Sequence, residues 1–305
     1  MSGQDRKKKT AAVSGQQGNG VVCGKRMRRG AQLWKNGLTR AFLIVVGVLM
    51  LYPLFWNIYS SFKTSTEFLG NPFALPTTLE WDNYVRALEK SNILANFKNS
   101  FYVVLLSLVL LALLVIPCSY CISRFRFLGH KLMRTLYMSM IFIQAPCIMI
   151  PLFLQMGQLG WLNKLTPLAL LYAVLQVPFS IFLLSGFMEG IAREYEEAAM
   201  IDGCGYWRIL PQIIVPLAKP GVVTVLMLAA MGIWNEYPVA LVMLTDPAKQ
   251  TVPIGVAAMY EVQRYATDWG ALFAALVLVL IPTVLLYAVG QKYLVEGVNV
   301  GGVKG

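Results

Sequence analysis

The chain has 305 residues, of which 57% are hydrophobic and 13% are charged, and its formal net charge is +11 at pH 7. Soluble globular domains have about 45–50% apolar and about 25% charged residues, so one buried core does not account for this composition. It indicates several membrane-spanning segments instead. The positive charge does not indicate a nucleic-acid partner, because the basic residues fall where a membrane topology would place them.

The N-terminal segment differs from the rest of the chain. Residues 1–36 are rich in Gly, Ser, Gln and basic residues, and they include "RKKK" and "KRMRR". The first apolar run begins only near Ala41, which is too far from the terminus for a secretory signal peptide. We therefore predict that residues 1–36 form a disordered basic arm in the cytoplasm.

Six apolar runs are each long enough to cross a membrane. A bilayer core of about 30 Å needs roughly 20 helical residues, and open strand edges do not occur in lipid, so each run is predicted to be a helix. The predicted spans are residues 41–62, 100–122, 135–156, 167–187, 221–244 and 270–290. The predicted fold class is an all-α membrane protein with six transmembrane helices.

The distribution of Lys and Arg predicts the orientation, because cytoplasmic loops carry an excess of both. With the N-terminus inside, the inner segments hold 19 of the 26 Lys and Arg residues. Both termini are then cytoplasmic, including a tail at 291–305, and so is the loop at 189–219. The loops at 63–98 and 245–269 face outside and are long enough to be structured.

No cofactor or metal site is expected on this chain. It contains no GxxxxGK[ST] phosphate loop, so it does not bind ATP in that way. The motif "CSYC" at 118–121 has redox or metal spacing, but a second pair is missing and His130 is the only histidine. Small buried side chains are the simpler interpretation of these cysteines.

The cytoplasmic loop at 189–219 has an unusual composition. Its segment "EYEEAAMIDGCGYWRILPQIIVPLAKPG" starts with strong helix formers and places three glutamates in the first turns, where the helix dipole favours anions. Gly203 and Gly205 are predicted to end this helix, and an amphipathic helix follows. The pattern predicts a docking helix–turn–helix at the inner membrane face. A helix lying on lipid, the alternative, usually has a basic polar face.

This loop resembles the EAA loop of ABC importer permeases, whose pattern is E-A-A, three residues, G and then an apolar stretch to L-P. The matching residues are Glu197, Ala198, Ala199, Asp202, Gly203 and Pro216. The segments "YPLFWNIYSSFK", "NSFYVV", "SRFRFLGHK" and "QKYLVEGVNVGGVKG" are similar to carbohydrate-uptake permeases of the maltose type. The resemblance covers residues 40–305 and implies the type I importer permease fold, with a transmembrane domain at 95–290 after a first helix at 41–62.

The resemblance also implies partners and a role for the loop. In this family the loop forms a coupling helix that binds in a cleft of a cytoplasmic ATPase subunit. The implied coupling residues are Glu197, Ala198, Ala199, Asp202 and Gly203, with Glu197 facing the ATPase or capping the turn and Gly203 forming the turn. The implied assembly, in the bacterial cytoplasmic membrane, contains a second and different permease, two ATPase subunits that hold ATP and Mg²⁺, and an external binding protein that delivers a sugar or oligosaccharide.

One acidic residue, Glu236, lies well inside a predicted span, in "GIWNEYP". Charges within the membrane are costly and usually functional. With Trp234, Asn235 and Tyr237 it forms a set of aromatic, amide and carboxylate groups that suits a sugar, so we expect these four residues to line the substrate path. The alternative is that Asn235 and Glu236 join neighbouring helices.

Other classes of membrane protein fit the sequence less well. A gradient-driven secondary transporter, the main alternative, would need several intramembrane acids or inverted repeats, and the spans contain one acid and no clear repeat. Nothing resembles a channel filter or a ring of charges. No paired carboxylates or catalytic triad indicates an enzyme, so we predict a transport subunit without catalytic residues.

Overall fold

The computed structural model describes residues 37, 39–90, 92–143, 145–263 and 268–302, and the regular elements within them are all helices. The predicted basic arm at 1–36 lies outside these residues. The chain divides into two units, residues 1–57 and 58–305. The apolar helix Thr39–Ser60, which begins in the first unit, is long enough to cross a membrane and matches the span predicted at 41–62.

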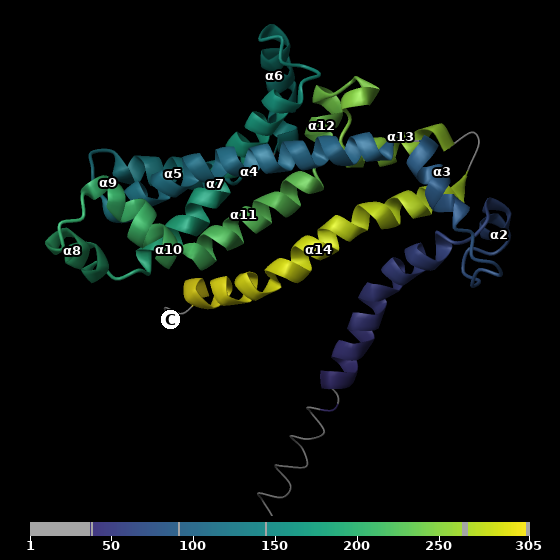
Figure 1. Cartoon of the computed structure of the whole chain (residues 1–305), viewed down its shortest axis with the longest axis horizontal. Coiled ribbons are helices and arrows are strands. Elements are labelled where there is room, and N and C mark those ends of the chain that lie inside the picture. The colour runs from purple at the N-terminus through teal and green to yellow at the C-terminus, as the bar shows by residue number, and fades with distance from the viewer. Residues whose placement is uncertain (1–36, 38, 91, 144, 264–267, 303–305) are drawn as a thin grey trace, which may run out of the picture. The chain divides into compact units, whose positions relative to one another are not determined.

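Four helices form the body of the second unit (Figure 1). They are α4 (Ile93–Arg124), α7 (Leu165–Glu189), α11 (Lys219–Trp234) and α14 (Trp269–Gly302). They run side by side, and α4 packs mainly against α7. Ser107 of α4 donates its hydroxyl to the carbonyl oxygen of Ala169 at 2.9 Å, and Ala169 is fully buried. Small residues at such a contact allow two helix backbones to approach closely.

The structure confirms an all-helical membrane fold. Among the described residues, four helices are long and apolar enough to cross a membrane: Thr39–Ser60, Ile93–Arg124, Leu165–Glu189 and Trp269–Lys292. A fifth span arises if Trp207–Leu217 and Lys219–Trp234, which are bent by 77°, are counted together. The four long helices correspond to the first, second, fourth and sixth predicted spans.

Two of the six predicted helices are interrupted, so a count of six continuous helices is not confirmed. The helix predicted at 135–156 is divided into α5 (His130–Met140) and α6 (Ala145–Gln158). The helix predicted at 221–244 ends with α11 at Trp234, and α12 (Pro238–Met243) follows after a break. Proline has no N–H to donate to the preceding turn, which favours a new helix start at Pro238. Broken helices still cross membranes where protein covers the break.

The end of α12 is held by the loop that precedes α7. Asn163 has a left-handed backbone with φ +56°. Its N–H donates to the carbonyl oxygen of Met243, and its Oδ1 accepts from the N–H groups of Thr245 and Asp246 at 2.7 and 2.9 Å. Asn163 therefore satisfies one carbonyl at the end of α12 with its backbone and two N–H groups just after the helix with its side chain.

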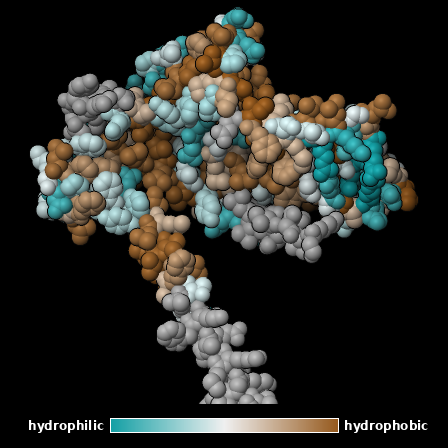
Figure 2. Space-filling model, turned by 180° about the vertical axis from the view of Figure 1, so that it is seen from behind, coloured by the Kyte–Doolittle hydropathy of each residue, from teal (hydrophilic) through white to brown (hydrophobic). Residues whose placement is uncertain are grey.

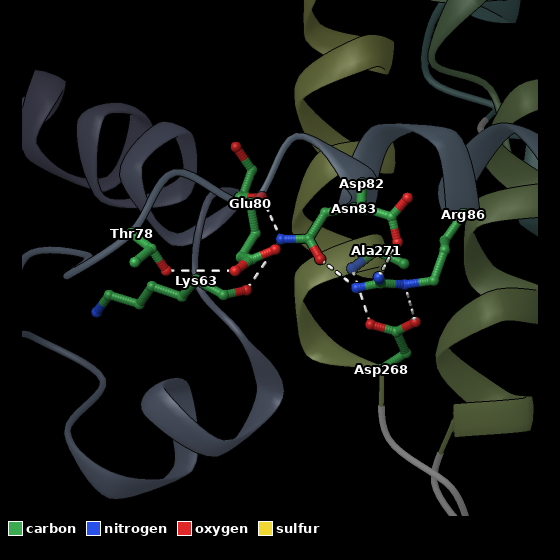
Figure 3. A network of polar contacts seen from close by, with 9 residues as sticks. Lys63, Thr78, Glu80, Asp82, Asn83, Arg86, Asp268 and Ala271 are labelled. Carbon is green, nitrogen blue, oxygen red and sulfur yellow. Dashed lines mark hydrogen bonds and ion pairs between the residues drawn. The ribbon is translucent and has the colours of Figure 1, made fainter.

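A polar network joins α3 (Asp82–Lys90) to the start of α14 (Figure 3). Arg86 donates to Asp268 at 2.9 Å and to Asp82 at 2.5 Å, and Asn83 donates to the carbonyl oxygens of Ser61 and Lys63 at 2.8 and 2.9 Å. Asn83 is fully buried. The network fixes α3 and the start of α14 together, at the end of the unit that also holds α2 (Ser65–Gly70) and α13 (Val252–Gln263) (Figure 1).

Lys63 is unusual for a lysine because its side chain is buried. Its Nζ donates to the carbonyl oxygen of Pro72 at 2.8 Å and lies 5.1 Å from the centre of the Tyr59 ring. Burial lowers the pKa of the Lys63 ammonium group, because the charged form loses hydration. The segment after the first apolar helix is therefore folded around this side chain.

The opposite end of the unit holds α8 (Glu194–Ile201), α9 (Tyr206–Ile209), the π-helix η1 (Leu210–Ile214) and α10 (Val215–Leu217) (Figure 1). Here α11 starts directly against the end of α7. A Cβ atom added at Gly221 would lie 2.5 Å from Cγ of Phe187. Glycine at this position is therefore required by close packing between the two helices.

Gly221→Ala should lower the free energy of unfolding by about 1–3 kcal/mol, because the added methyl group forces α11 away from Phe187. Thermal unfolding of the detergent-solubilised protein measures this loss. Gly186→Ala is the matched control, since a Cβ at Gly186 on α7 meets nothing within 4 Å. Equal unfolding temperatures for the two variants would contradict the packing argument.

Arg86→Gln should lower the free energy of unfolding by about 1–3 kcal/mol, because Asp268 loses a charged hydrogen-bond donor. Lys249→Gln is the control, since Lys249 pairs with Asp246 at 3.3 Å in a more exposed position. That pair is worth about 0–1 kcal/mol. Denaturation of both variants in detergent checks the difference, and similar losses would refute a special role of Arg86.

Candidate functional site

The first helix in the loop at 189–219 is α8, and it ends in a glycine turn. The N–H of Cys204 donates to the carbonyl oxygen of Ala199 at 2.9 Å, and that of Gly203 donates to Met200 at 3.1 Å. Gly203 has φ +79°. These bonds define a Schellman motif, which favours glycine at the left-handed position. The predicted turn is therefore present at Gly203, whereas Gly205 has an ordinary φ of −65°.

The end of the unit around α8 presents acidic and apolar side chains together. Of the residues implied for coupling, Glu197, Ala198, Asp202 and Gly203 are exposed and Ala199 is buried. Two large apolar side chains nearby, Ile201 and Trp207, are 86% and 93% exposed. Figure 2 shows hydrophilic and hydrophobic residues beside one another at this end. Exposed apolar side chains among polar ones are typical of a protein-binding surface.

An ion pair connects α8 to the end of α4. Glu196 lies 2.6 Å from Nε of Arg124 and accepts a hydrogen bond from the hydroxyl of Tyr120 at 3.1 Å. Arg124 also donates to the carbonyl oxygen of Ile191 at 2.8 Å. Arg124 and Tyr120 were not among the residues predicted from the sequence. An arginine directly after an apolar run, on the same side as an acidic helix, was the available signal, but the sequence does not identify its partner among three glutamates.

A sharp bend connects the loop to α11. Just after η1 the N–H of Val215 donates to the carbonyl oxygen of Leu210, and Pro211 has no N–H to donate to the preceding turn. The chain then turns by 77° between Trp207–Leu217 and α11. The loop is thus joined to α11 through the backbone and to α4 through side chains.

Trp234, one of the residues predicted to line a sugar path, is part of the core. Its side chain is 2% exposed, and its ring lies 5.9 Å from the ring of Phe97 and 5.2 Å from that of Phe101. Within the described residues its indole N–H has no hydrogen-bond partner. The Trp234 ring, which was expected to line the substrate path, is therefore covered by other residues of the chain.

Glu236 caps the helix that follows the break. Its carboxylate accepts from the N–H groups of Val239 at 2.8 Å and Ala240 at 3.0 Å, and it accepts a short hydrogen bond from the hydroxyl of Tyr172 on α7. Glu236 thus joins α12 to α7, as in the alternative considered above. Proline at the first helical position marks the start of α12, and an acid near a helix start is favoured by the helix dipole.

The other two predicted path residues remain accessible. Asn235 is exposed, and its side-chain amide donates to the carbonyl oxygen of Met231 at 2.8 Å. Tyr237 is partly buried at the start of α12. The four consecutive residues therefore differ in their surroundings. Trp234 and Glu236 are occupied by contacts within the chain, whereas Asn235 and Tyr237 lie nearer the surface.

Known proteins resemble this chain over most of its length. The diacetylchitobiose uptake system permease protein NgcG of Streptomyces coelicolor is 35% identical over 87% of each chain. The trehalose/maltose transport system permease protein MalG of Thermococcus litoralis is 33% identical over 88% of this chain and 98% of its own. A crystal structure of a bacterial ABC transporter for the import of alginate matches with a TM-score of 0.74 and 25% identity, over 84% of this chain and 95% of the other.

The family model for the binding-protein-dependent transport system inner membrane component matches residues 93–300. This range contains α4, the α8 loop, the break after Trp234 and all but the last two residues of α14. The chain therefore belongs to the family of binding-protein-dependent transport system inner membrane components, and it is a multi-pass permease subunit of an ABC importer rather than an enzyme.

Proposed function

We propose that this chain is one of two different permease subunits that form the membrane path for a sugar or oligosaccharide, driven by a cytoplasmic ATPase that docks on α8. An external binding protein delivers the substrate. The observation that carries this proposal is α8, a short exposed helix ended by a glycine turn and followed by a bend into α11. Such a helix offers a partner a compact surface with a defined shape.

The surface around α8 suits a protein partner better than lipid. Exposed Glu197 and Asp202 lie near the exposed apolar side chains of Ile201 and Trp207. Acidic side chains are repelled by the anionic cytoplasmic leaflet, whereas a basic ATPase cleft lined with apolar groups would bind both kinds of side chain. Glu197, Ala198, Ala199, Asp202 and Gly203 are therefore proposed as the coupling residues.

The orientation and the remaining partners form part of the same proposal. The excess of Lys and Arg on one side supports cytoplasmic termini and a cytoplasmic α8. ATP and Mg²⁺ would be bound by two copies of the partner ATPase, because this chain contains no phosphate loop. The location would be the bacterial cytoplasmic membrane.

Sugar as the substrate class is supported by the relatives and by the break at 235–237. The names of similar permeases refer to diacetylchitobiose and to trehalose and maltose. Asn235 and Tyr237 supply amide and hydroxyl groups that suit sugar hydroxyls, while Trp234 and Glu236 hold the break in shape. We therefore assign direct substrate contact to Asn235 and Tyr237, and a supporting role to the other two residues. Family membership gives no support to a gradient-driven transporter.

Gly203→Val should abolish most ATP-dependent uptake, because a β-branched residue is strained at φ +79° and distorts the end of α8. Uptake and stimulated ATP hydrolysis are measured in vesicles that contain the complete transporter. Gly205→Ala is the matched control, since its φ is −65° and a Cβ there meets nothing within 4 Å. Full uptake by assembled Gly203→Val, or uptake without ATP in the wild type, would refute the proposed coupling.

Asn235→Ala should raise the KM for sugar uptake several-fold without lowering the unfolding temperature. The lost hydrogen bond to the sugar corresponds to about 1–1.5 kcal/mol of binding free energy. Glu236→Gln should lower the unfolding temperature instead, because one oxygen that accepts from α12 is replaced by an NH₂ group. Uptake kinetics and thermal unfolding of both variants test this division. A KM unchanged by Asn235→Ala would remove this residue from the substrate path.

A further inference from the structure

A strong polar connection ties α8 to the membrane helices. The carboxylate of Glu196 and the guanidinium of Arg124 approach to 2.6 Å, and their side chains are only 14% and 5% exposed. We propose that this ion pair makes α8 and α4 move as one body, so that a displacement of α8 by the docked ATPase passes directly into α4. The inference rests on the proposed function, since it assumes that the ATPase binds α8.

The geometry of the contact makes it stiff. Tyr120, one turn before Arg124 on α4, donates to Oε2 of Glu196, while Arg124 lies against Oε1. The carboxylate is thus fixed by a hydrogen bond on one oxygen and by a close charge contact on the other. Arg124 also donates to the carbonyl oxygen of Ile191, so it binds the chain on both sides of the entry into α8. The low exposure of both charges limits screening by water.

The receiving helix extends through the whole unit. α4 has 32 residues, which corresponds to about 48 Å at the rise of an α-helix. Near its other end, Asn99 donates to the carbonyl oxygens of Ala248 and Gln250 at 3.1 and 3.0 Å, and Ser100 accepts from the N–H of Val252 at 2.9 Å. The far end of α4 is thus bonded to the segment 248–252, in the loop predicted to face outside.

A second ion pair at the same end provides a comparison. Arg134 of α5 and Glu189 of α7 lie 3.3 Å apart, with side chains 47% and 40% exposed. Exposed pairs of this kind contribute about 0–1 kcal/mol and do not hold two helices rigidly. Arg134→Gln therefore removes a charge pair of the same chemistry without removing the connection between α8 and α4.

The first test compares Glu196→Gln with Arg134→Gln in the complete transporter in vesicles. Glu196→Gln keeps the size of the side chain but removes the charge that Arg124 binds. We expect it to co-purify with the ATPase and to import about tenfold less sugar per ATP hydrolysed, a loss within the usual range of coupling between sites. Arg134→Gln should keep the wild-type ratio. The proposal is overturned if Glu196→Gln imports an amount of sugar per ATP that lies within about twofold of the wild type. It is also overturned if the ATPase no longer co-purifies with Glu196→Gln.

The second test needs no change to the ion pair. Cys121 is exposed on the last turn of α4, and Glu194 is exposed at the start of α8. Spin labels on Cys121 and on Glu194→Cys, in a chain whose other cysteines are replaced by serine, report the distance between the two helices. We expect one unchanged, narrow distance distribution with and without ATP. A shift with ATP shows that α8 moves without α4 and overturns the proposal.

These outcomes differ from failure of the proposed function. Uptake by the wild type without ATP, or a wild-type chain that does not bind the ATPase, would refute docking on α8 itself. Both are visible in the unmodified transporter before any variant is compared. A wild-type transporter that depends on ATP, together with a full coupling ratio in Glu196→Gln, refutes only the role of the ion pair.

Discussion

In a lipid bilayer each backbone N–H and C=O group needs a hydrogen-bond partner within the protein, and this requirement shapes the whole chain. It explains why every regular element among the described residues is a helix. It also explains where polar side chains lie, because each interruption of a helix frees backbone groups that other residues must satisfy. Glu236 does so at the start of α12.

The interruptions are also the places where the chain offers something to a partner or substrate. The break after Trp234 leaves Asn235 exposed within an otherwise apolar segment. The bend before α11 leaves α8 outside the helix bundle, with an acidic and apolar surface. Continuous helices supply the rigid frame, and the irregular backbone between them supplies the contacts. Polar side chains such as Glu236 keep these irregular parts in one conformation.

The two ends of the second unit are stabilised by related contacts. At one end Arg86 and Asp268 join α3 to α14, and at the other Arg124 and Glu196 join α4 to α8. In both, an arginine contacts a carboxylate from a distant part of the chain. Arg86 also donates to Oδ1 of Asn83, and Arg124 also donates to the carbonyl oxygen of Ile191. The guanidinium suits this use, because it stays charged and carries several donors that reach more than one oxygen. The α4 helix extends between the two ends, which is the basis for proposing it as the element that carries the motion of α8.

The all-helical membrane fold, four long spans and the turn at Gly203 could be predicted from the sequence. The physical reason is that these features depend on local chemistry: apolar length for a span, and the left-handed backbone that glycine tolerates for the turn. The division of two predicted spans and the partner of Glu196 could not be predicted. Likewise, the sequence identified Trp234 and Glu236 as a group, but only the tertiary structure showed one ring buried against Phe101 and one carboxylate capping α12. Those outcomes depend on which residues from distant helices come together, and that information is absent from any single window of sequence.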